Sequence, residues 1–363
     1  MKVLGVSHSA VAGPYREKWR LLAKRRGWKL TLALPEAWPE GGSLLRADAA
    51  PWGSLKHAVL GTRLTGRIGF FSYRGLAALV DALRPDLVYC EEEPYSLAAF
   101  QAARAAKRCG AAFVFFSWEN IERRFKPPLN WVRGRVQGMS AGAVVGNSEG
   151  MALYRSWGFE GPMALIPQYG VDGKLFKPAR AKRGFQAGYV GRLVREKGAD
   201  LFVRACALSG LPGLVVGRGP DELALKALAS ALKADIEFRP FVPFEARHEI
   251  YAGLSALVLP SRGTAKWKEQ FGRVIIEAGA CGVPTLGSDS GAIPEVVGKG
   301  GMIFGEGDAK GLAGLMRQLA ADPRLRRRLG AEARRNALGR FGEARLASRL
   351  GEFLEGVLES SRR

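Results

Sequence analysis

Short apolar runs alternate with stretches of helical periodicity along the whole chain. In the first half, the pattern predicts strands at 3–6, 29–35, 86–90, 112–117 and 141–148, and helices at 15–27, 75–84 and 95–109. Strands and helices in alternation are typical of βαβ units, which build a parallel sheet. A basic stretch between the second strand and the helix at 75–84 has no such pattern, and we expect loops there.

The second half starts the alternation again. Apolar segments at 185–191, 213–217, 236–241, 255–260, 274–282 and 283–288 alternate with helical patterns at 198–210 and 221–232. A helical tract rich in Arg, Glu and Leu follows from Pro323 to Leu358. We therefore expect an α/β protein with two doubly wound, Rossmann-like domains that face each other across a cleft.

The boundary between the halves is marked by composition. Residues 166–184 are polar and punctuated by glycine and proline, as linkers are. We expect an N-terminal domain over 1–168, a linker over 169–184, a C-terminal domain over 185–338 and a helical tail over 339–363.

Composition narrows the class of protein. The 363 residues are 47% hydrophobic and 25% charged, which is ordinary for a globular chain of two domains. No apolar run approaches the roughly 18 residues of a membrane span. Four cysteines without CxxC spacing and three histidines support neither a zinc knuckle nor a disulfide scaffold. We expect a cytoplasmic enzyme.

The net charge of +21 has two interpretations. The excess of basic residues is spread over both halves, unlike the single basic face or tail of a dedicated nucleic-acid binder. It indicates either an Arg-rich solvated surface or attraction to an anionic partner such as a sugar nucleotide, an acidic glycan or a bilayer. One local basic cluster is interleaved with Phe125 and Trp131; it consists of Arg123, Arg124, Lys126, Arg133 and Arg135.

The segment EQFGRVIIE, residues 269–277, carries the most specific pattern in the chain. Glu269 and Glu277 are eight positions apart, so on a helix both carboxylates project toward one side. Gly272 allows the backbone to approach a ligand closely, and the free amides of a first helical turn attract phosphate.

This segment and the following CGVPTLGSDSGAIPEVVG resemble the family-4 glycosyltransferases, which are retaining enzymes with the GT-B fold. The resemblance is detailed over residues 140–320 and holds in outline over the first 140. It implies that Glu269 holds hydroxyls of the donor sugar and Glu277 the ribose, with assistance from backbone near Phe271 and Gly272. It also implies that the C-terminal helix packs back on the N-terminal domain.

A second motif, YVGRLVREKGAD at 189–200, places Arg192 and Lys197 just after a strand and Gly191. Two fixed cations can neutralise a nucleoside diphosphate as it leaves. The resemblance implies this role for the pair without a divalent ion or other cofactor. No Asp-x-Asp occurs in the chain, so the ligands of the usual metal–diphosphate site are missing.

Weaker matches follow the family order and complete the donor side. They are the Gly-rich turn at Gly217 and Gly219 and the base-reading stretch at Phe241 and Val242. Within EQFGRVIIE, we also expect Arg273 and Val274 to bind the donor. A plain strand–helix connection explains the two glycines equally well. Backbone readout leaves no side-chain signature, so the nucleobase stays open.

In the first half, polar residues follow the predicted strands. His8 and Gly13 come after the first strand, and Glu91, Glu92 and Glu93 come after the third. We expect them to face the acceptor, because ligands bind at the carboxyl ends of parallel strands. A hydrogen-bonded loop histidine and a solvated charge run are the alternatives.

The chain departs from the family where many members carry a histidine after the next strand. Trp118, Glu119 and Asn120 stand there instead, and Glu119 is the best carboxylate for holding the acceptor. A missing histidine does not exclude catalysis, because the leaving phosphate can itself take the proton of the acceptor hydroxyl.

These observations predict a metal-independent retaining glycosyltransferase that moves a hexose from a nucleoside diphosphate to a glycan, lipid-linked or small-molecule hydroxyl. Basic residues and aromatics within 123–135 are candidates for peripheral contact with an anionic membrane. A GT-B sugar-nucleotide epimerase is the first alternative, although the chain offers few poised acids and bases. An anionic-surface or nucleic-acid binding module is the second.

Overall fold

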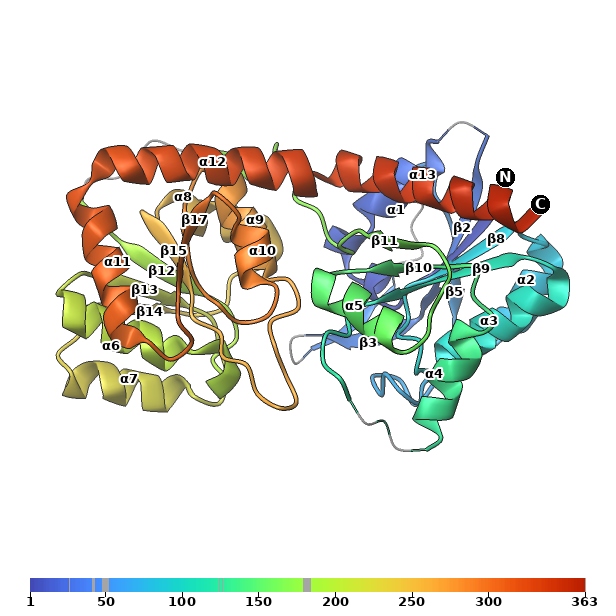
Figure 1. The fold of residues 1–363 in the computed structure, drawn as a ribbon, viewed down its shortest axis with the longest axis horizontal. Coiled ribbons are helices and arrows are strands. Elements are labelled where there is room, and N and C mark those ends of the chain that lie inside the picture. Colours follow the sequence, from blue (N-terminus) through green and yellow to red (C-terminus); the bar gives the residue numbers. More distant parts are fainter. Residues whose placement is uncertain are drawn as a thin grey trace. The chain divides into compact units, whose positions relative to one another are not determined.

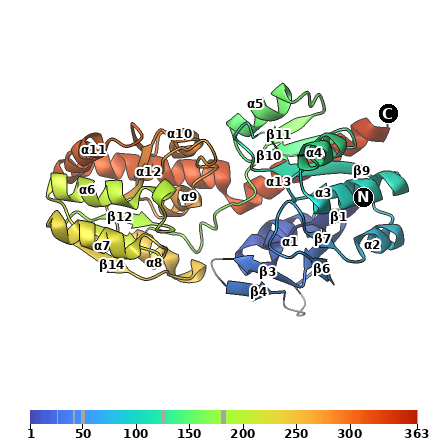
Figure 2. The ribbon, with the colours of Figure 1, turned by 90° about the horizontal axis from the view of Figure 1, so that it is seen from below.

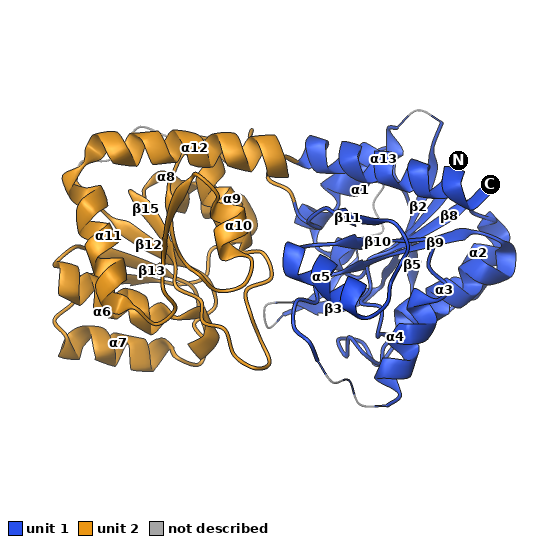
Figure 3. Ribbon diagram, viewed as in Figure 1, with its two compact units in different colours: residues 1–169, 343–363 blue, residues 170–342 orange. Residues whose placement is uncertain are grey.

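In the computed structural model, the chain forms two compact units, residues 1–169 with 343–363 and residues 170–342 (Figure 3). The structure describes residues 1–362 except 26, 41–42, 48–51, 124, 126 and 179–183. Within each unit, helices cover a parallel sheet, so the predicted α/β class with two Rossmann-like domains is confirmed.

The sheet of unit 1 has the strand order β11-β10-β9-β8-β1-β2-β5, and each neighbouring pair is parallel. The strands are β1 (Lys2–Val6), β2 (Lys29–Pro35), β5 (Lys56–Leu60), β8 (Leu87–Cys90), β9 (Ala112–Ser117), β10 (Gly142–Val145) and β11 (Met163–Leu165). β8 and β10 are buried along their full length, as strands covered on both faces are. The chain winds outward from β1 on one side and from β8 on the other, so the sheet has a switch point between β1 and β8.

Helices and short antiparallel pairs surround this sheet. The helices are α1 (Glu17–Ala23), α2 (Leu76–Leu83), α3 (Leu97–Cys109), α4 (Leu129–Gln137), α5 (Ser148–Ser156) and α13 (Glu343–Arg362). The antiparallel pairs are β3 (Ala37–Glu40) with β4 (Ser43–Arg46) and β6 (Thr62–Arg63) with β7 (Ser72–Tyr73). Two 3₁₀ turns, Ser9–Val11 and Gly13–Tyr15, precede α1.

Unit 2 repeats the arrangement with the order β14-β13-β12-β15-β16-β17, again parallel throughout. Its strands are β12 (Ala187–Val190), β13 (Gly213–Val216), β14 (Ile236–Arg239), β15 (Ala256–Leu259), β16 (Thr285–Ser288) and β17 (Gly301–Phe304). Its switch point lies between β12 and β15. Its helices are α6 (Ala199–Ser209), α7 (Glu222–Ala231), α8 (Arg247–Ala252), α9 (Arg273–Ala280), α10 (Ile293–Val297), α11 (Ala309–Ala321) and α12 (Pro323–Phe341), and Figures 1 and 2 show α9 beside α12.

Some predicted elements differ from the observed ones. Residues 274–282, grouped with the apolar segments, form α9, and the strand predicted at 141–148 ends at Val145. Asn147 caps α5 there by accepting a hydrogen bond from the Gly150 N–H. The helix predicted at 15–27 starts only at Glu17, because the turn containing Pro14 precedes it. The stretch expected to be loops contains β3 to β7.

The chain passes between the units twice, at Tyr169–Gly170 and at Gly342–Glu343. The predicted tail start at residue 339 is too early, because α12 continues to Phe341 and Gly342 adopts an extended conformation. The helix after it, α13, belongs to unit 1 and lies against α1 (Figure 1), which confirms that the C-terminal helix packs on the N-terminal domain. Arg25 donates two hydrogen bonds to Glu355, at 2.8 and 2.7 Å, and fixes the helix there.

We expect Leu354→Ala to lower the free energy of unfolding of unit 1 by about 2–5 kcal/mol, because the side chain is fully buried in the core of that unit. Urea unfolding followed by tryptophan fluorescence measures the change. Glu359→Ala, exposed on the same helix, is the matched control. Equal stability of the two variants would mean that α13 contributes no packing to unit 1.

Candidate functional site

The carboxyl ends of β12 and β15 bring the predicted catalytic residues of unit 2 together. Lys197 lies on the 3₁₀ turn Arg195–Lys197 after β12, and Ser261 and Glu269 follow β15. These strands are neighbours at the switch point, so their polar ends share one edge of the sheet. Glu269 thereby contacts Ser261, eight positions away in the sequence, and Lys197, 72 positions away.

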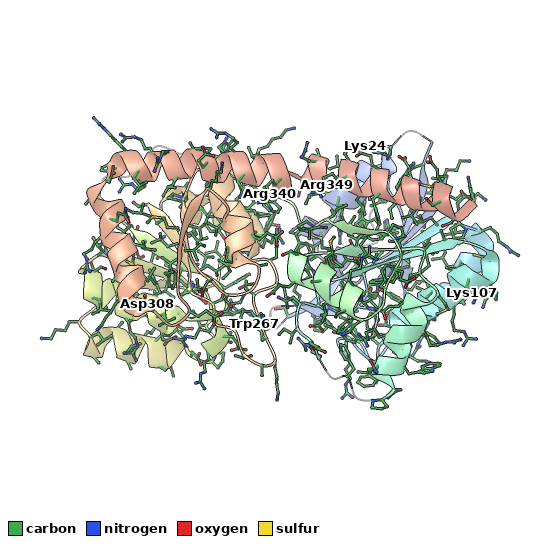
Figure 4. All side chains as sticks on the ribbon, viewed as in Figure 1. Lys24, Lys107, Trp267, Asp308, Arg340 and Arg349 are labelled. Carbon is green, nitrogen blue, oxygen red and sulfur yellow. The ribbon has the colours of Figure 1, made fainter. Side chains whose placement is uncertain are left out.

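Lys197 and Glu269 form an ion pair at this edge. The Lys197 Nζ donates to Glu269 Oε2 at 2.7 Å, and the Ser261 hydroxyl donates to the same oxygen at 2.9 Å. The Lys197 Nζ also lies 4.8 Å from the ring centroid of Trp267, which Figure 4 labels, so the ring face stabilises the ammonium. The side chains are 18% and 8% exposed, so the pair is held in place by its surroundings.

Arg192 provides a second cation, on the loop that joins β12 to the turn of Lys197. It is exposed, and within the described residues its guanidinium has no ion-pair partner. Its carbonyl oxygen accepts a hydrogen bond from the Tyr189 hydroxyl at 2.6 Å, which fixes the backbone of the loop. The side chain therefore remains available for an anion.

The start of α9 differs from the expectation in one respect. The helix begins at Arg273, so Glu269 lies in the loop before it and the two carboxylates do not share a helix. Gly272 has a φ of 75°, a left-handed conformation that side chains other than glycine rarely adopt. This sharp turn positions the loop, and with it Glu269.

Glu277 is buried on α9 and has protein partners on both oxygens. The Tyr251 hydroxyl donates to Oε2 at 2.7 Å, and Oε1 forms ion pairs with Arg273 at 2.9 Å and Arg247 at 3.7 Å. Arg273 also lies 4.3 Å from the ring centroid of Phe244. The side chain of Glu277 is only 1% exposed, so a ribose has to compete with these partners for it.

The remaining predicted donor-side residues differ in burial and in their partners. Phe241 is 45% exposed, with the guanidinium carbons of Arg218 and Arg247 at 5.4 and 5.5 Å from its ring centroid. The carbonyl oxygen of Val242 accepts a bond from Arg247 Nε at 3.3 Å. Phe271 instead packs in the core against Phe341. Val274 lies partly buried in the first turn of α9.

The glycines predicted from the Gly-rich turn serve close backbone packing. A Cβ on Gly217 would lie 1.9 Å from the carbonyl oxygen of Gly191, and one on Gly219 would lie 2.2 Å from that of Leu193. The loops after β12 and β13 therefore lie in direct contact, which fixes the turn that carries Arg192 and Lys197.

In unit 1, the three adjacent glutamates after β8 have separate environments, and none is part of a solvated charge run. Glu91 and Glu92 have fully buried side chains. Glu91 pairs with Lys18 and accepts further bonds from Ser7 at 2.9 Å and Gln168 at 3.1 Å. Burial lowers the pKa of Lys18, while Glu91 opposes that change. Glu91 thus has a complete set of internal partners.

Glu92 binds His8, the predicted acceptor-side histidine. It accepts hydrogen bonds from the backbone N–H and Nδ1 of His8 and from the Tyr73 hydroxyl. Tyr73 is not among the residues predicted from the sequence. Neither are Trp38 and Phe71, which both pack on the imidazole of His8. These residues lie between the second predicted strand and the helix predicted at 75–84. That stretch has no hydrophobic periodicity, so no local sequence pattern indicates that they lie near His8.

Glu93 and Glu119 are two further carboxylates, which follow β8 and β9. Burial raises the pKa of Glu93 to about 7, although bonds from Ser117 at 2.6 Å and the Trp118 N–H at 2.8 Å oppose the shift. Burial also raises the pKa of Glu119, against the opposing effect of Arg123 at 3.1 Å. Glu93 is therefore partly protonated at neutral pH.

Two other predicted acceptor residues have clear positions. Asn120 is buried, and its Nδ2 donates to Glu149 at 3.0 Å. Gly13 starts the 3₁₀ turn before α1, and a Cβ there would meet no atom within 4 Å, so packing does not require glycine.

The basic-aromatic cluster divides into a packed and an exposed part. Arg133 lies 3.7 Å from the ring centroid of Trp157, and burial lowers its pKa. On α4, Trp131 is 57% exposed and has Arg135 at 5.9 Å from its ring centroid. Arg124 and Lys126 lie outside the described residues.

The described residues contain neither a membrane-spanning helix nor a cluster of metal ligands. Among the helices that the structure describes, none has both the length and the apolarity needed to span a bilayer. In the same residues, no three His, Cys, Asp or Glu side chains gather so that they could hold a metal ion. Metal independence itself stays a prediction.

Two family models match the chain on either side of the passage between the units. "Glycosyl transferase 4-like domain" matches residues 13–168, and "Glycosyl transferases group 1" matches residues 172–336. The matches cover the strands of the two sheets except β1, and they include Glu91, Glu92 and Glu93 as well as Arg192, Lys197 and Glu269. His8 precedes the first match.

Curated relatives carry glycosyltransferase names. The chain is 32% identical over 229 residues to the GDP-mannose-dependent alpha-(1-6)-phosphatidylinositol monomannoside mannosyltransferase of Mycolicibacterium smegmatis, covering 55% of this chain and 59% of that protein. It is 29% identical over 255 residues to a D-inositol 3-phosphate glycosyltransferase of Streptomyces bingchenggensis, covering 62% and 55%. The chain thus spans little more than half the length of these relatives.

Solved structures share the fold over nearly the whole chain. Sucrose-phosphate synthase from Thermosynechococcus elongatus superposes with a TM-score of 0.76 at 19% identity, covering 99% of this chain and 100% of that one. Anabaena HepE in complex with UDP superposes with a TM-score of 0.77 at 18% identity, covering 98% and 100%. The shared architecture shows the GT-B fold, and the two matched models, which together cover residues 13–168 and 172–336, show that the chain belongs to the family-4 type of glycosyltransferases.

Proposed function

We propose that this protein transfers a hexose from a nucleoside-diphosphate sugar to an acceptor hydroxyl, with retention at the anomeric carbon and without a divalent cation. The observation that carries the proposal is the arrangement of Arg192, Lys197 and Glu269 at the switch point of unit 2. It combines an available guanidinium, an ammonium and a carboxylate at the edge of the sheet where ligands bind.

The chemistry assigns one task to each group. When the bond between the anomeric carbon and the diphosphate breaks, negative charge grows on the diphosphate, and Arg192 and Lys197 stabilise it. Glu269 accepts hydrogen bonds from hydroxyls of the donor sugar. Because it also holds Lys197 at 2.7 Å, the carboxylate positions the ammonium before the donor arrives.

Glu277 is proposed to bind the ribose. Its partners Arg273, Arg247 and Tyr251 already orient the carboxylate, so a diol can replace an arginine contact without moving it. Phe241, flanked by two arginines, offers an exposed ring on which the base can stack.

The relatives suggest which substrates to try first. The mycobacterial relative is named for GDP-mannose and a phosphatidylinositol mannoside, and HepE structures contain UDP and UDP-glucose. We therefore take GDP-mannose and UDP-glucose as first donors, and a glycan or lipid-linked polyol as acceptor class. A thermal-shift screen against nucleotide sugars tests donor binding directly. The comparisons do not favour the epimerase alternative.

The proposal also includes peripheral contact with an anionic bilayer through the exposed part of the basic-aromatic cluster. A tryptophan with 57% exposure beside an arginine suits the interface between lipid and water. Nearby cations add attraction to anionic headgroups at about 1 kcal/mol each.

We expect Arg192→Ala or Lys197→Ala to slow turnover by about 10²-fold or more, because each removes a charge that stabilises the leaving diphosphate. Release of nucleoside diphosphate from GDP-mannose and UDP-glucose measures the effect. Arg204→Ala, exposed on α6, is the control for loss of charge alone. Turnover should persist in excess EDTA; if chelation abolishes it and added metal restores it, the two-cation account is wrong.

Substitutions of Glu277 and Glu269 should affect different parts of the donor. Glu277→Gln should weaken binding of free GDP or UDP by about 10- to 100-fold, since a charged hydrogen bond to the ribose is lost. Glu269→Gln should leave free nucleotide binding nearly unchanged and impair sugar transfer. Calorimetry with each nucleotide measures the difference in affinity. The variant Tyr251→Phe shows how much of the affinity depends on the orientation of Glu277. Equal losses of nucleotide affinity in the two glutamate variants would contradict the separate roles.

The protein should sediment with anionic vesicles, less so in high salt, and not with neutral ones. Trp131→Ala combined with Arg135→Gln should reduce this binding by at least about fivefold, the effect of one lost cation. Leu223→Ala with Arg327→Gln, both exposed in unit 2, is the matched control. The same reduction in both double variants would mean that net charge alone attracts the protein.

A further inference from the structure

A cavity of about 480 Å³ lies in unit 1 at the amino ends of β1 and β2. Because the strands of this sheet are parallel, the cavity is at the edge opposite to the one that carries His8 and Glu92. Its volume is within the range of small-molecule sites, roughly 300–1,000 Å³. The lysines that begin β1, β2 and β5 contribute to its lining; they are Lys2, Lys29 and Lys56.

The strand register places these three lysines on one face of the sheet. Lys2 is the register partner of Lys29, and Lys56 is the partner of Thr31, two residues after Lys29. Register partners in adjacent strands share a face, and so do residues two positions apart in one strand. With about 4.8 Å between strands and about 3.3 Å per residue, consecutive lysines start roughly 5 and 8 Å apart. Thr31, which also lines the cavity, adds a hydroxyl to the same face.

The lysines have no counter-ions. Among the residues that the structure describes, none of the three forms an ion pair. The Lys2 Nζ donates to the carbonyl oxygen of Leu83 at 3.5 Å, and the other two side chains are exposed. Like charges at neighbouring positions of adjacent strands repel each other. An anion placed among the ammoniums would remove this repulsion.

Two carboxylates close to the lining residues have other partners. Asp86 accepts hydrogen bonds from the backbone N–H of Lys2 and from Arg362, both at 2.7 Å. Glu355 accepts a hydrogen bond from Trp28 Nε1 at 2.8 Å. These carboxylates therefore do not neutralise the lysine side chains.

The ends of two helices also contribute to the cavity. Ala23 and Leu83, the last residues of α1 and α2, are part of its lining. The carboxyl end of a helix carries at most about half a negative charge. Two such ends offset about one of the three lysine charges, so a positive charge of about two remains. A ligand that neutralises the cavity therefore carries at least two negative charges.

We propose that this cavity binds a small molecule with two or more phosphate groups, and that Lys2, Lys29 and Lys56 contact the phosphate oxygens. A lysine ammonium is a compact charge with three donors, which suits the oxygens of phosphate. Each phosphate monoester supplies a charge of about −1.5 to −2 at neutral pH, so two phosphates match the cavity. The phosphates are either joined in one chain or attached at separate positions of a sugar or polyol.

Calorimetry with two probes tests the proposal and distinguishes these ligand types. Inorganic pyrophosphate represents a phosphate chain, and fructose 1,6-bisphosphate represents separate phosphates. Both are titrated at fixed ionic strength into the Arg192→Ala/Lys197→Ala double variant, because these two residues are proposed to bind diphosphate in unit 2. We expect one site whose affinity for at least one probe exceeds that for inorganic phosphate by about tenfold or more, the effect of one further charged hydrogen bond.

Substitution of two lysines identifies the cavity as the site. In the same background, Lys29→Gln with Lys56→Gln should weaken binding by about 100-fold or more, about tenfold for each lost contact. Lys2 is kept, because its ammonium also contacts the end of α2. The matched control is Lys24→Gln with Lys107→Gln, two exposed lysines of unit 1 that Figure 4 labels and that do not line the cavity. Its affinity should stay within about twofold, because distant surface charges are screened.

Urea unfolding of each variant establishes that it is folded at the temperature of the titration. Loss of binding in the Lys29 and Lys56 variant alone supports the site. If neither probe binds the Arg192→Ala/Lys197→Ala variant, or if the control loses as much affinity, the proposal is overturned. Either of these results leaves the proposed transfer reaction unaffected, since that reaction depends on other residues.

Discussion

Parallel strand pairing is the constraint on which the functional geometry of this protein depends. In both main sheets every neighbouring pair is parallel, so all strands end at one edge and the connections between them carry the polar residues. Each sheet winds outward in two directions from a switch point, at β1/β8 and at β12/β15. The His8–Glu92 pair lies at the first switch point and the Lys197–Glu269 pair at the second.

Buried charge is the second constraint, because an ionised side chain without a partner is costly in the interior. The buried Lys18 and Glu91 neutralise each other, and Glu91 accepts further hydrogen bonds from Ser7 and Gln168. This pair has a structural role only. Lys197 with Glu269 satisfies the same constraint while retaining partial exposure of the ammonium. Such a pair stays ordered without ligand and still presents groups that a diphosphate and a sugar can engage, so preorganisation and substrate binding use the same contacts.

The sequence predicts those parts of the molecule that local pattern determines. Runs rich in apolar residues locate β2 and β9 to the residue, because both strands are largely buried. The EQFGRVIIE motif identifies the family and the loop of Glu269. Contacts between distant segments are different: Tyr73 reaches Glu92 and Tyr251 reaches Glu277 only through tertiary packing. The helix start at Arg273, which leaves Glu269 outside α9, depends on a left-handed Gly272 that spacing alone does not reveal.

The central claim is that this chain breaks the bond between sugar and diphosphate and retains the anomeric configuration. Proton NMR of the reaction in D₂O with an α-configured donor, such as UDP-glucose or GDP-mannose, and EDTA tests it most directly. The account predicts accumulation of nucleoside diphosphate and the α-anomer of the free sugar as the first product, before mutarotation. The β-anomer as first product, or an epimerised sugar nucleotide with no diphosphate released, would contradict it.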